Sequence, residues 1–154
     1  MKNKKSKSAF SMIELVFVIV IIGILAAVAI PRLAATRDDA EIAKARVLVA
    51  SVRNALAMER QKRILRGNFT PITSVGNGTN VFDKFSDDGN GNTADVLEYA
   101  MASSSSKGKW ELVDGTYVYH GLSDVIFEVV NGKFECDTAK TSNTNASGCT
   151  QLTN

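Results

Sequence analysis

The chain has 154 residues, enough for one domain and one additional element, and it carries a formal net charge of +2. Four lysines lie before Phe10 in a segment without acidic residues, and the remainder has 14 basic and 16 acidic side chains. Because the excess positive charge is confined to this short segment, the composition excludes a generally basic nucleic-acid-binding protein.

A long apolar segment follows the lysines and contains a single carboxylate. The chain reads KSKSAFSMIELVFVIVIIGILAAVAIPRL from Lys5 to Leu33, and the stretch from Leu15 to Ile30 is uncharged. As a helix this stretch spans about 24 Å, less than the roughly 30 Å hydrocarbon core of a bilayer. Extending the helix back to Phe10 supplies the missing length but places Glu14 in the membrane, which costs on the order of 2–3 kcal/mol.

Three interpretations fit this segment, and in each the lysines orient its start toward the cytoplasm. A secretory signal peptide would be cleaved at the small residues 27–29, although Glu14 and Pro31 fit this interpretation poorly. A signal anchor would keep the segment, with Glu14 snorkelling to the interface. Cleavage before Phe10 would instead leave the whole apolar helix at the start of the mature protein.

The third interpretation matches a known family. The stretch KSAFSMIELVFVIVIIGILAAVAIPRL resembles the amino terminus of type IV pilins and type II secretion pseudopilins, in which a prepilin peptidase removes a short basic leader before a Phe and the new amine is N-methylated. Counted from Phe10, Glu14 is the fifth residue and Pro31 the twenty-second, as in the family pattern. Gly23 also fits, whereas Ala9 stands where the family usually has Gly.

The resemblance implies roles for particular residues. Cleavage would fall between Ala9 and Phe10, Phe10 would be N-methylated, and Glu14 would pair with the terminal amine of a neighbouring subunit. Pairing inside a helical bundle removes most of the penalty for a carboxylate in lipid, so Glu14 would set the register of assembly. Pro31 cannot donate a backbone hydrogen bond, and we expect a kink or local melting of the helix at residues 27–31.

An amphipathic helix is expected after Pro31. Acidic residues occupy its early turns and basic residues its last turns, and Gly67-Asn68 follows as a stop signal. The sequence predicts one helix from Phe10 to about Arg66. Apolar residues at spacings of three and four form a stripe on its second half, which must pack against the rest of the chain: Ile42, Ala45, Val49, Val52 and Leu56.

The remainder of the chain favours a small antiparallel sheet. Asp114-Gly115 and Asn131-Gly132 are strong hairpin signals between runs rich in β-branched and aromatic residues. A short helix is expected at Thr93–Ala102. The predicted fold is therefore α+β and pilin-like, with the long amino-terminal helix packed on a sheet of about four strands. These strands are expected at Trp110–Val113, Thr116–His120, Asp124–Val130 and Lys133–Cys136.

Cys136 and Cys149 flank a segment rich in Ser, Thr and Asn. The segment has no His and no further Cys, which disfavours a metal site and favours a disulfide. A disulfide here would stabilise the fold by about 3 kcal/mol and would indicate an oxidising compartment outside the cytoplasm. Two free thiols in a reducing compartment are the alternative.

One loop contains a candidate calcium site. Asp88, Asn90 and Asn92 place oxygen-bearing side chains at alternating positions, as in a calcium loop. However, Thr93 stands where the EF-hand pattern has Gly, and Tyr99 stands where it has Glu. An Asn/Gly turn before the expected helix is therefore the preferred interpretation, with calcium retained as a candidate and no other cofactor expected.

Two other features have both a functional and a plain structural interpretation. The basic run RQKRILR, residues 60–66, could contact nucleic-acid phosphates or complement the helix dipole on a solvated face. His120 is the only histidine and has no recognisable nucleophile partner, so we expect it to be structural. The chain is not expected to be an enzyme.

These features predict a structural filament subunit, a pseudopilin of a type II secretion or transformation system. A type IV pilus subunit for adhesion, motility or DNA uptake is the alternative, and a monomeric membrane-anchored periplasmic binding module is an alternative of another class. The expected partners are other copies, other pilin-like subunits, prepilin peptidase and the inner membrane, with DNA as a further candidate. The protein should cross the inner membrane once and place its head in the periplasm.

The expected organisation has four parts. A prepilin leader (1–9) precedes a transmembrane or filament-core helix (10–31), and an amphipathic helix (32–67) leads into an α+β head with a disulfide-closed carboxy-terminal loop (68–154).

Overall fold

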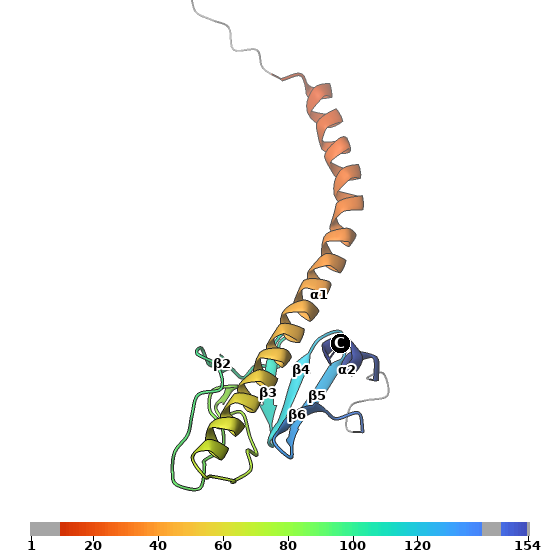
Figure 1. Cartoon of the computed structure of the whole chain (residues 1–154). Coiled ribbons are helices and arrows are strands. Elements are labelled where there is room, and N and C mark those ends of the chain that lie inside the picture. Colours follow the sequence, from red (N-terminus) through yellow and green to blue (C-terminus); the bar gives the residue numbers. More distant parts are fainter. Residues whose placement is uncertain (1–9, 140–145, 154) are drawn as a thin grey trace, which may run out of the picture. The chain divides into compact units, whose positions relative to one another are not determined.

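The computed structural model describes residues 10–139 and 146–153 (Figure 1). The chain forms two compact units, one ending at Arg37 and one beginning at Asp38. The first unit is helical throughout its described part apart from its first two residues. The second unit, here called the head, contains the rest of the same helix and all of the strands.

The long helix α1 runs from Met12 to Leu65. It continues through Pro31, so the local melting expected at residues 27–31 is wrong. Pro31 removes one hydrogen bond, but the neighbouring turns consist largely of Ala and other residues that form helices readily and keep their own bonds.

The end of α1 follows the stop signal in the sequence. The N–H of Asn68 donates to the Arg63 carbonyl at 2.9 Å, and the N–H of Gly67 donates to the Ile64 carbonyl at 2.9 Å. Gly67 has a φ of 73°, the left-handed conformation that glycine adopts without strain. These two bonds form a Schellman motif, which satisfies the last carbonyls of the helix.

The main sheet has four antiparallel strands in the order β3-β4-β5-β6. The hairpin turns after β3 and β5 place Asp114, Gly115, Asn131 and Gly132 at positive φ, as two-residue type I′ turns require. The strand bounds agree with the sequence prediction: β3 Trp110–Val113, β4 Thr116–His120, β5 Asp124–Val130 and β6 Lys133–Cys136.

Three short elements were not predicted. β1 (Asn80–Val81) and β2 (Met101–Ala102) pair antiparallel, and α2 (Ala146–Thr153) follows the segment between the cysteines. The helix expected at Thr93–Ala102 is wrong. Backbone groups of this segment bond instead to residues 83–85, with the Val96 N–H donating to the Asp83 carbonyl at 2.8 Å.

The core of the head lies between α1 and the sheet. The predicted stripe on α1 is confirmed, because Ala45, Val49, Val52 and Leu56 are buried and Ile42 is partly buried against them. Aromatic rings from the sheet and from the segment before it pack together, with ring centroids 5.0–6.4 Å apart. These rings belong to Phe82, Trp110, Tyr117, Tyr119, Phe127 and Phe134. The fold is thus α+β and consistent with a pilin-like architecture.

Candidate functional site

The first unit presents an uncovered apolar helix. Every large apolar side chain from Phe10 to Leu33 is exposed, with exposed fractions from 41% at Ile21 to 87% at Met12. Among the described residues, α1 is the one helix long and apolar enough to cross a membrane. Apolar surface of this extent is unfavourable in water, so lipid or other apolar helices must cover it.

Ser11 caps the start of α1. Its Oγ accepts a hydrogen bond from the Glu14 N–H at 3.2 Å, and its carbonyl accepts one from the Leu15 N–H at 3.2 Å. Ser at the cap and Glu three residues later form the S-x-x-E pattern of a capping box. We did not predict this role, although the pattern is visible in the sequence. The exposed Glu14 carboxylate therefore lies in the first turn, where the helix dipole favours negative charge.

The prokaryotic N-terminal methylation motif matches residues 4–30. The chain carries the prepilin-type signal of type IV pilins and pseudopilins. No curated protein and no solved structure matches the chain. This prepilin-type signal implies processing by a prepilin peptidase and assembly with other pilin-like subunits. Together with the apolar helix, it indicates a membrane-anchored, pilin-like structural subunit rather than an enzyme.

The processing residues lie at the boundary of the described part. Ala9 and the leader 1–9 fall outside the described residues, whereas Phe10 is described, precedes the first turn of α1 and is 77% exposed. Cleavage after Ala9, methylation of Phe10 and pairing of Glu14 with a neighbouring amine stay predictions.

The candidate calcium loop is organised as a turn around Asp88. Its Oδ1 accepts from the N–H groups of Asn90 and Asn92 at 2.9 and 3.2 Å, and its Oδ2 accepts from Asn92 Nδ2 at 3.3 Å. These hydrogen bonds hold the pKa of the Asp88 carboxyl below its ordinary value, and the bond from the Asn90 N–H has the largest effect. The described residues contain no group of three or more His, Cys, Asp or Glu side chains suited to a metal ion.

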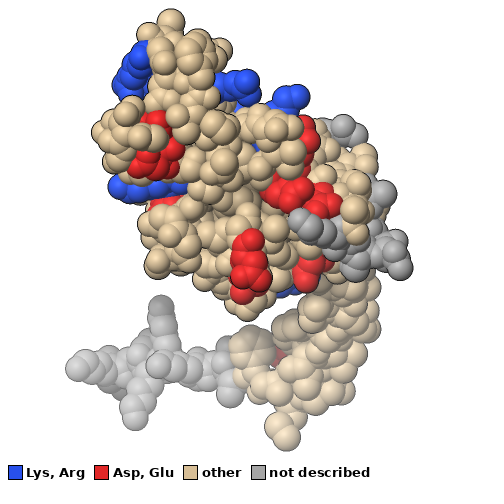
Figure 2. Space-filling model, turned by 90° about the horizontal axis from the view of Figure 1, so that it is seen from below, with Lys and Arg blue, Asp and Glu red and all other residues tan. Residues whose placement is uncertain are grey.

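The basic run is partly engaged inside the head. Figure 2 shows Lys and Arg side chains at several separate places on the head, with Asp and Glu beside some of them and in patches of their own. Arg63 is buried, and its Nε donates to Glu59 Oε1 at 3.1 Å. Its Nη2 donates to the Ser86 carbonyl at 2.6 Å. Arg63 is therefore a structural side chain that is not accessible to a phosphate.

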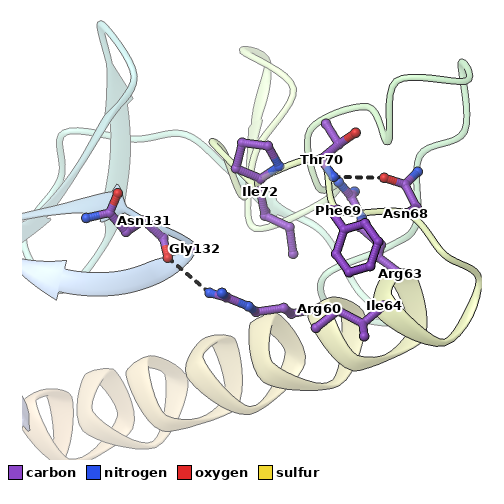
Figure 3. A pocket seen from close by; sticks show the side chains of 10 residues that line it. Arg60, Arg63, Ile64, Asn68, Phe69, Thr70, Ile72, Asn131 and Gly132 are labelled. Carbon is purple, nitrogen blue, oxygen red and sulfur yellow. Dashed lines mark hydrogen bonds between the residues drawn. The ribbon is translucent and has the colours of Figure 1, made fainter.

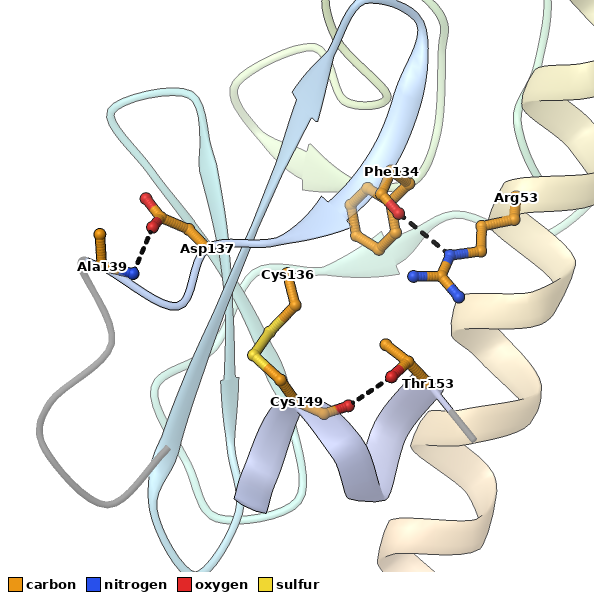
Figure 4. Close-up of a disulfide and its surroundings, with 7 residues drawn as sticks. All are labelled: Arg53, Phe134, Cys136, Asp137, Ala139, Cys149 and Thr153. Atoms are coloured by element: carbon orange, nitrogen blue, oxygen red, sulfur yellow. Dashed lines mark hydrogen bonds between the residues drawn. A yellow bond between two sulfur atoms is a disulfide. The ribbon is translucent and has the colours of Figure 1, made fainter. Parts of the chain in front are cut away.

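Three arginines spaced seven residues apart on α1 hold the carboxy-terminal part of the chain. Arg46 Nε donates to the Gln151 carbonyl at 2.9 Å, and Arg53 Nε donates to the Phe134 carbonyl at 3.0 Å (Figure 4). Arg60 Nη1 donates to the Asn131 carbonyl at 3.2 Å (Figure 3). Seven residues are about two helical turns, so all three lie on one face. The sequence placed Arg60 in the basic run, as a nucleic-acid contact or as a dipole complement on a solvated face, and did not indicate this arginine face.

The expected disulfide is present and anchors α2. Cys136 in β6 is bonded to Cys149 in α2 (Figure 4). Cys149 and Leu152, three positions apart on this helix, are both buried and belong to the core. The disulfide and Arg46 thus fix the last described residues to the rest of the head.

His120 joins three strands at one end of the sheet. Its Nδ1 lies 2.8 Å from Asp124 Oδ1 of β5, and its Nε2 lies 2.9 Å from Glu111 Oε2 of β3. Burial lowers the pKa of His120, but the bonds to Asp124 and Glu111 outweigh it and raise the pKa above the ordinary value. Only the protonated ring donates to both carboxylates at once.

Proposed function

We propose that the protein is a pseudopilin, a structural subunit that leaves the membrane and polymerises through α1 into a short filament of a type II secretion or transformation system. The observation that carries this proposal is the combination of the methylation motif at residues 4–30 with an apolar helix whose large side chains are all exposed. Lipid would cover this surface before assembly, and the apolar helices of other copies would cover it in the filament.

Glu14 supports assembly rather than a static anchor. Its carboxylate lies in the first turn of α1, four residues after Phe10, whose amine becomes the chain terminus if the leader is removed. A carboxylate in a membrane is penalised unless it is paired, and the new amine of a neighbouring copy offers a pair. Such pairing would favour the assembled state over the free subunit.

The head supports placement in the periplasm. It contains a disulfide, which forms in oxidising compartments, and the lysines before Phe10 retain the start of the chain in the cytoplasm. Its modest size suits a short filament, which favours a pseudopilin over the subunit of a long surface pilus. DNA is not part of this proposal, because Arg63, at the centre of the basic run, is buried and bonded inside the head.

Glu14→Ala tests the proposal. The variant should insert into the membrane normally, because the substitution removes an unfavourable charge. It should not enter filaments in a strain in which the unsubstituted protein assembles. Glu135→Ala, an exposed carboxylate of β6 in the head, serves as a matched loss of one carboxylate and should both insert and enter filaments normally. Normal incorporation of Glu14→Ala would contradict the assembly role and favour a monomeric anchored module.

A further inference from the structure

A small pocket lies at the carboxy-terminal end of α1, bounded by the last turns of the helix, the segment 68–72 and the β5–β6 turn (Figure 3). Its volume is about 240 Å³, below the roughly 300–1,000 Å³ of sites for drug-sized ligands, so it suits a single side chain. Its lining contains both apolar and polar side chains. We call it the Phe69 pocket, and its main lining residues are Arg60, Ile64, Phe69, Pro71, Ile72 and Asn131.

The side chains that line the Phe69 pocket are suited to bind an aromatic ring next to a carboxylate. Phe69 is 79% exposed, so its ring is available for stacking. Arg60 uses Nη1 for Asn131, and its other N–H groups have no partner among the residues that the structure describes. No carboxylate lines the pocket. An incoming carboxylate could therefore form a charge-assisted hydrogen bond with Arg60.

The same chain exposes a segment with this chemistry. Tyr99 is 79% exposed, and it follows the exposed residue Glu98 on a bend before β2. Within the described part of the chain, the Glu98 carboxylate has no hydrogen-bond or ion-pair partner. Asp95, also exposed, adds a second negative charge to this segment. We call residues 95–99 the Tyr99 segment.

We infer that the Tyr99 segment of one copy docks in the Phe69 pocket of a second copy, with Tyr99 against Phe69 and Glu98 paired with Arg60. This inference rests on the proposed polymerisation, which brings copies together. The contact joins two different surfaces of the chain. A growing row of copies therefore always has an unused pocket at one end and an unused Tyr99 segment at the other, to which further copies can bind. Tyr, Phe and Arg are also the side chains enriched at the centres of protein interfaces.

Disulfide cross-linking in filaments tests the contact. One variant carries Thr70→Cys at the pocket, and a second carries Ala100→Cys beside the Tyr99 segment. The two are assembled together into filaments, since α1 is unaltered in both, and the filaments are then oxidised. Their cross-linked dimer should form, whereas Thr70→Cys with Ser105→Cys, an exposed loop residue, should not cross-link. Absence of the dimer from normally assembled filaments, or an equal yield with Ser105→Cys, would overturn the inference and leave the proposed function intact. Failure of the unsubstituted chain to form any filament would contradict the proposed function itself.

A charge exchange provides a second test. Glu98→Arg should weaken association between heads by about tenfold, the factor that corresponds to about 1.4 kcal/mol, and should lower filament yield. Arg60→Glu combined with Glu98→Arg should restore the yield, because the pair is re-formed with reversed charges. Glu135→Arg makes the same charge change at an exposed position of β6 and should have no effect. Failure of the double variant to recover, in heads with normal Trp110 fluorescence, or an equal loss with Glu135→Arg, would overturn the contact.

Discussion

Removal of the Cys136–Cys149 disulfide should destabilise the head without unfolding it. The two cysteines are 13 residues apart, and closing a loop of this length lowers the entropy of the unfolded chain enough to contribute about 3 kcal/mol. A double Cys→Ser variant loses this contribution, and α2 loses its covalent attachment to β6. Small domains have urea m-values of about 1–3 kcal/mol/M, so the unfolding midpoint should fall by about 1–3 M.

Trp110 provides the assay. It is the only tryptophan, it is 2% exposed, and it packs against Phe82, Tyr119 and Phe127 in the core, so its fluorescence reports unfolding of the head. Urea titrations of the detergent-solubilised chain would compare the oxidised protein, the reduced protein and the double variant. The reduced protein should resemble the variant, and reductant should not affect the variant further. Equal midpoints for all three would refute the reasoning from loop closure.

Two further predictions concern buried and half-buried charges in the head. Arg63→Leu should lower the free energy of unfolding by about 3–5 kcal/mol, because it leaves Glu59 buried without its ion pair. Lys62→Ala, at the exposed neighbouring position, should change the same free energy by less than about 0.5 kcal/mol in the urea titration. The folded-state pKa of His120 is raised above 6.5, so its contribution to stability is complete below pH 6.5 and is lost as the pH rises through the folded-state value. His120→Gln should therefore reduce the unfolding free energy by on the order of 0.5–1 kcal/mol at low pH and by less at high pH, and a loss independent of pH would contradict a role for the protonated ring.

The strongest local signals in the sequence predicted the sheet well. Asn131-Gly132 and Asp114-Gly115 define tight turns by their own backbone preferences, so the flanking strands follow from neighbouring residues alone. The stripe from Ile42 to Leu56 was equally clear, because its helical spacing repeats over several turns.

Other elements depend on contacts between distant segments and were missed for that reason. The residues from Thr93 to Ala102 do not form a helix, because their backbone bonds to residues 83–85. Among the described side chains of α2, Cys149 and Leu152 are the buried apolar ones, too few for a pattern, and the position of the helix depends on the disulfide and on Arg46. The arginine face of α1 is visible as a spacing of seven, but its partners are backbone carbonyls, which no sequence pattern identifies.

Filament assembly requires that a prepilin peptidase cleave this chain before Phe10 and leave the apolar helix α1 on the mature subunit. Intact-mass measurement with terminal sequencing of the membrane-extracted protein would identify the start of the mature chain. The mature chain should begin at N-methylated Phe10. A chain that retains residues 1–9 would indicate a static anchor, and a chain that begins at Ile30 would indicate a secreted soluble head; either result would contradict the account.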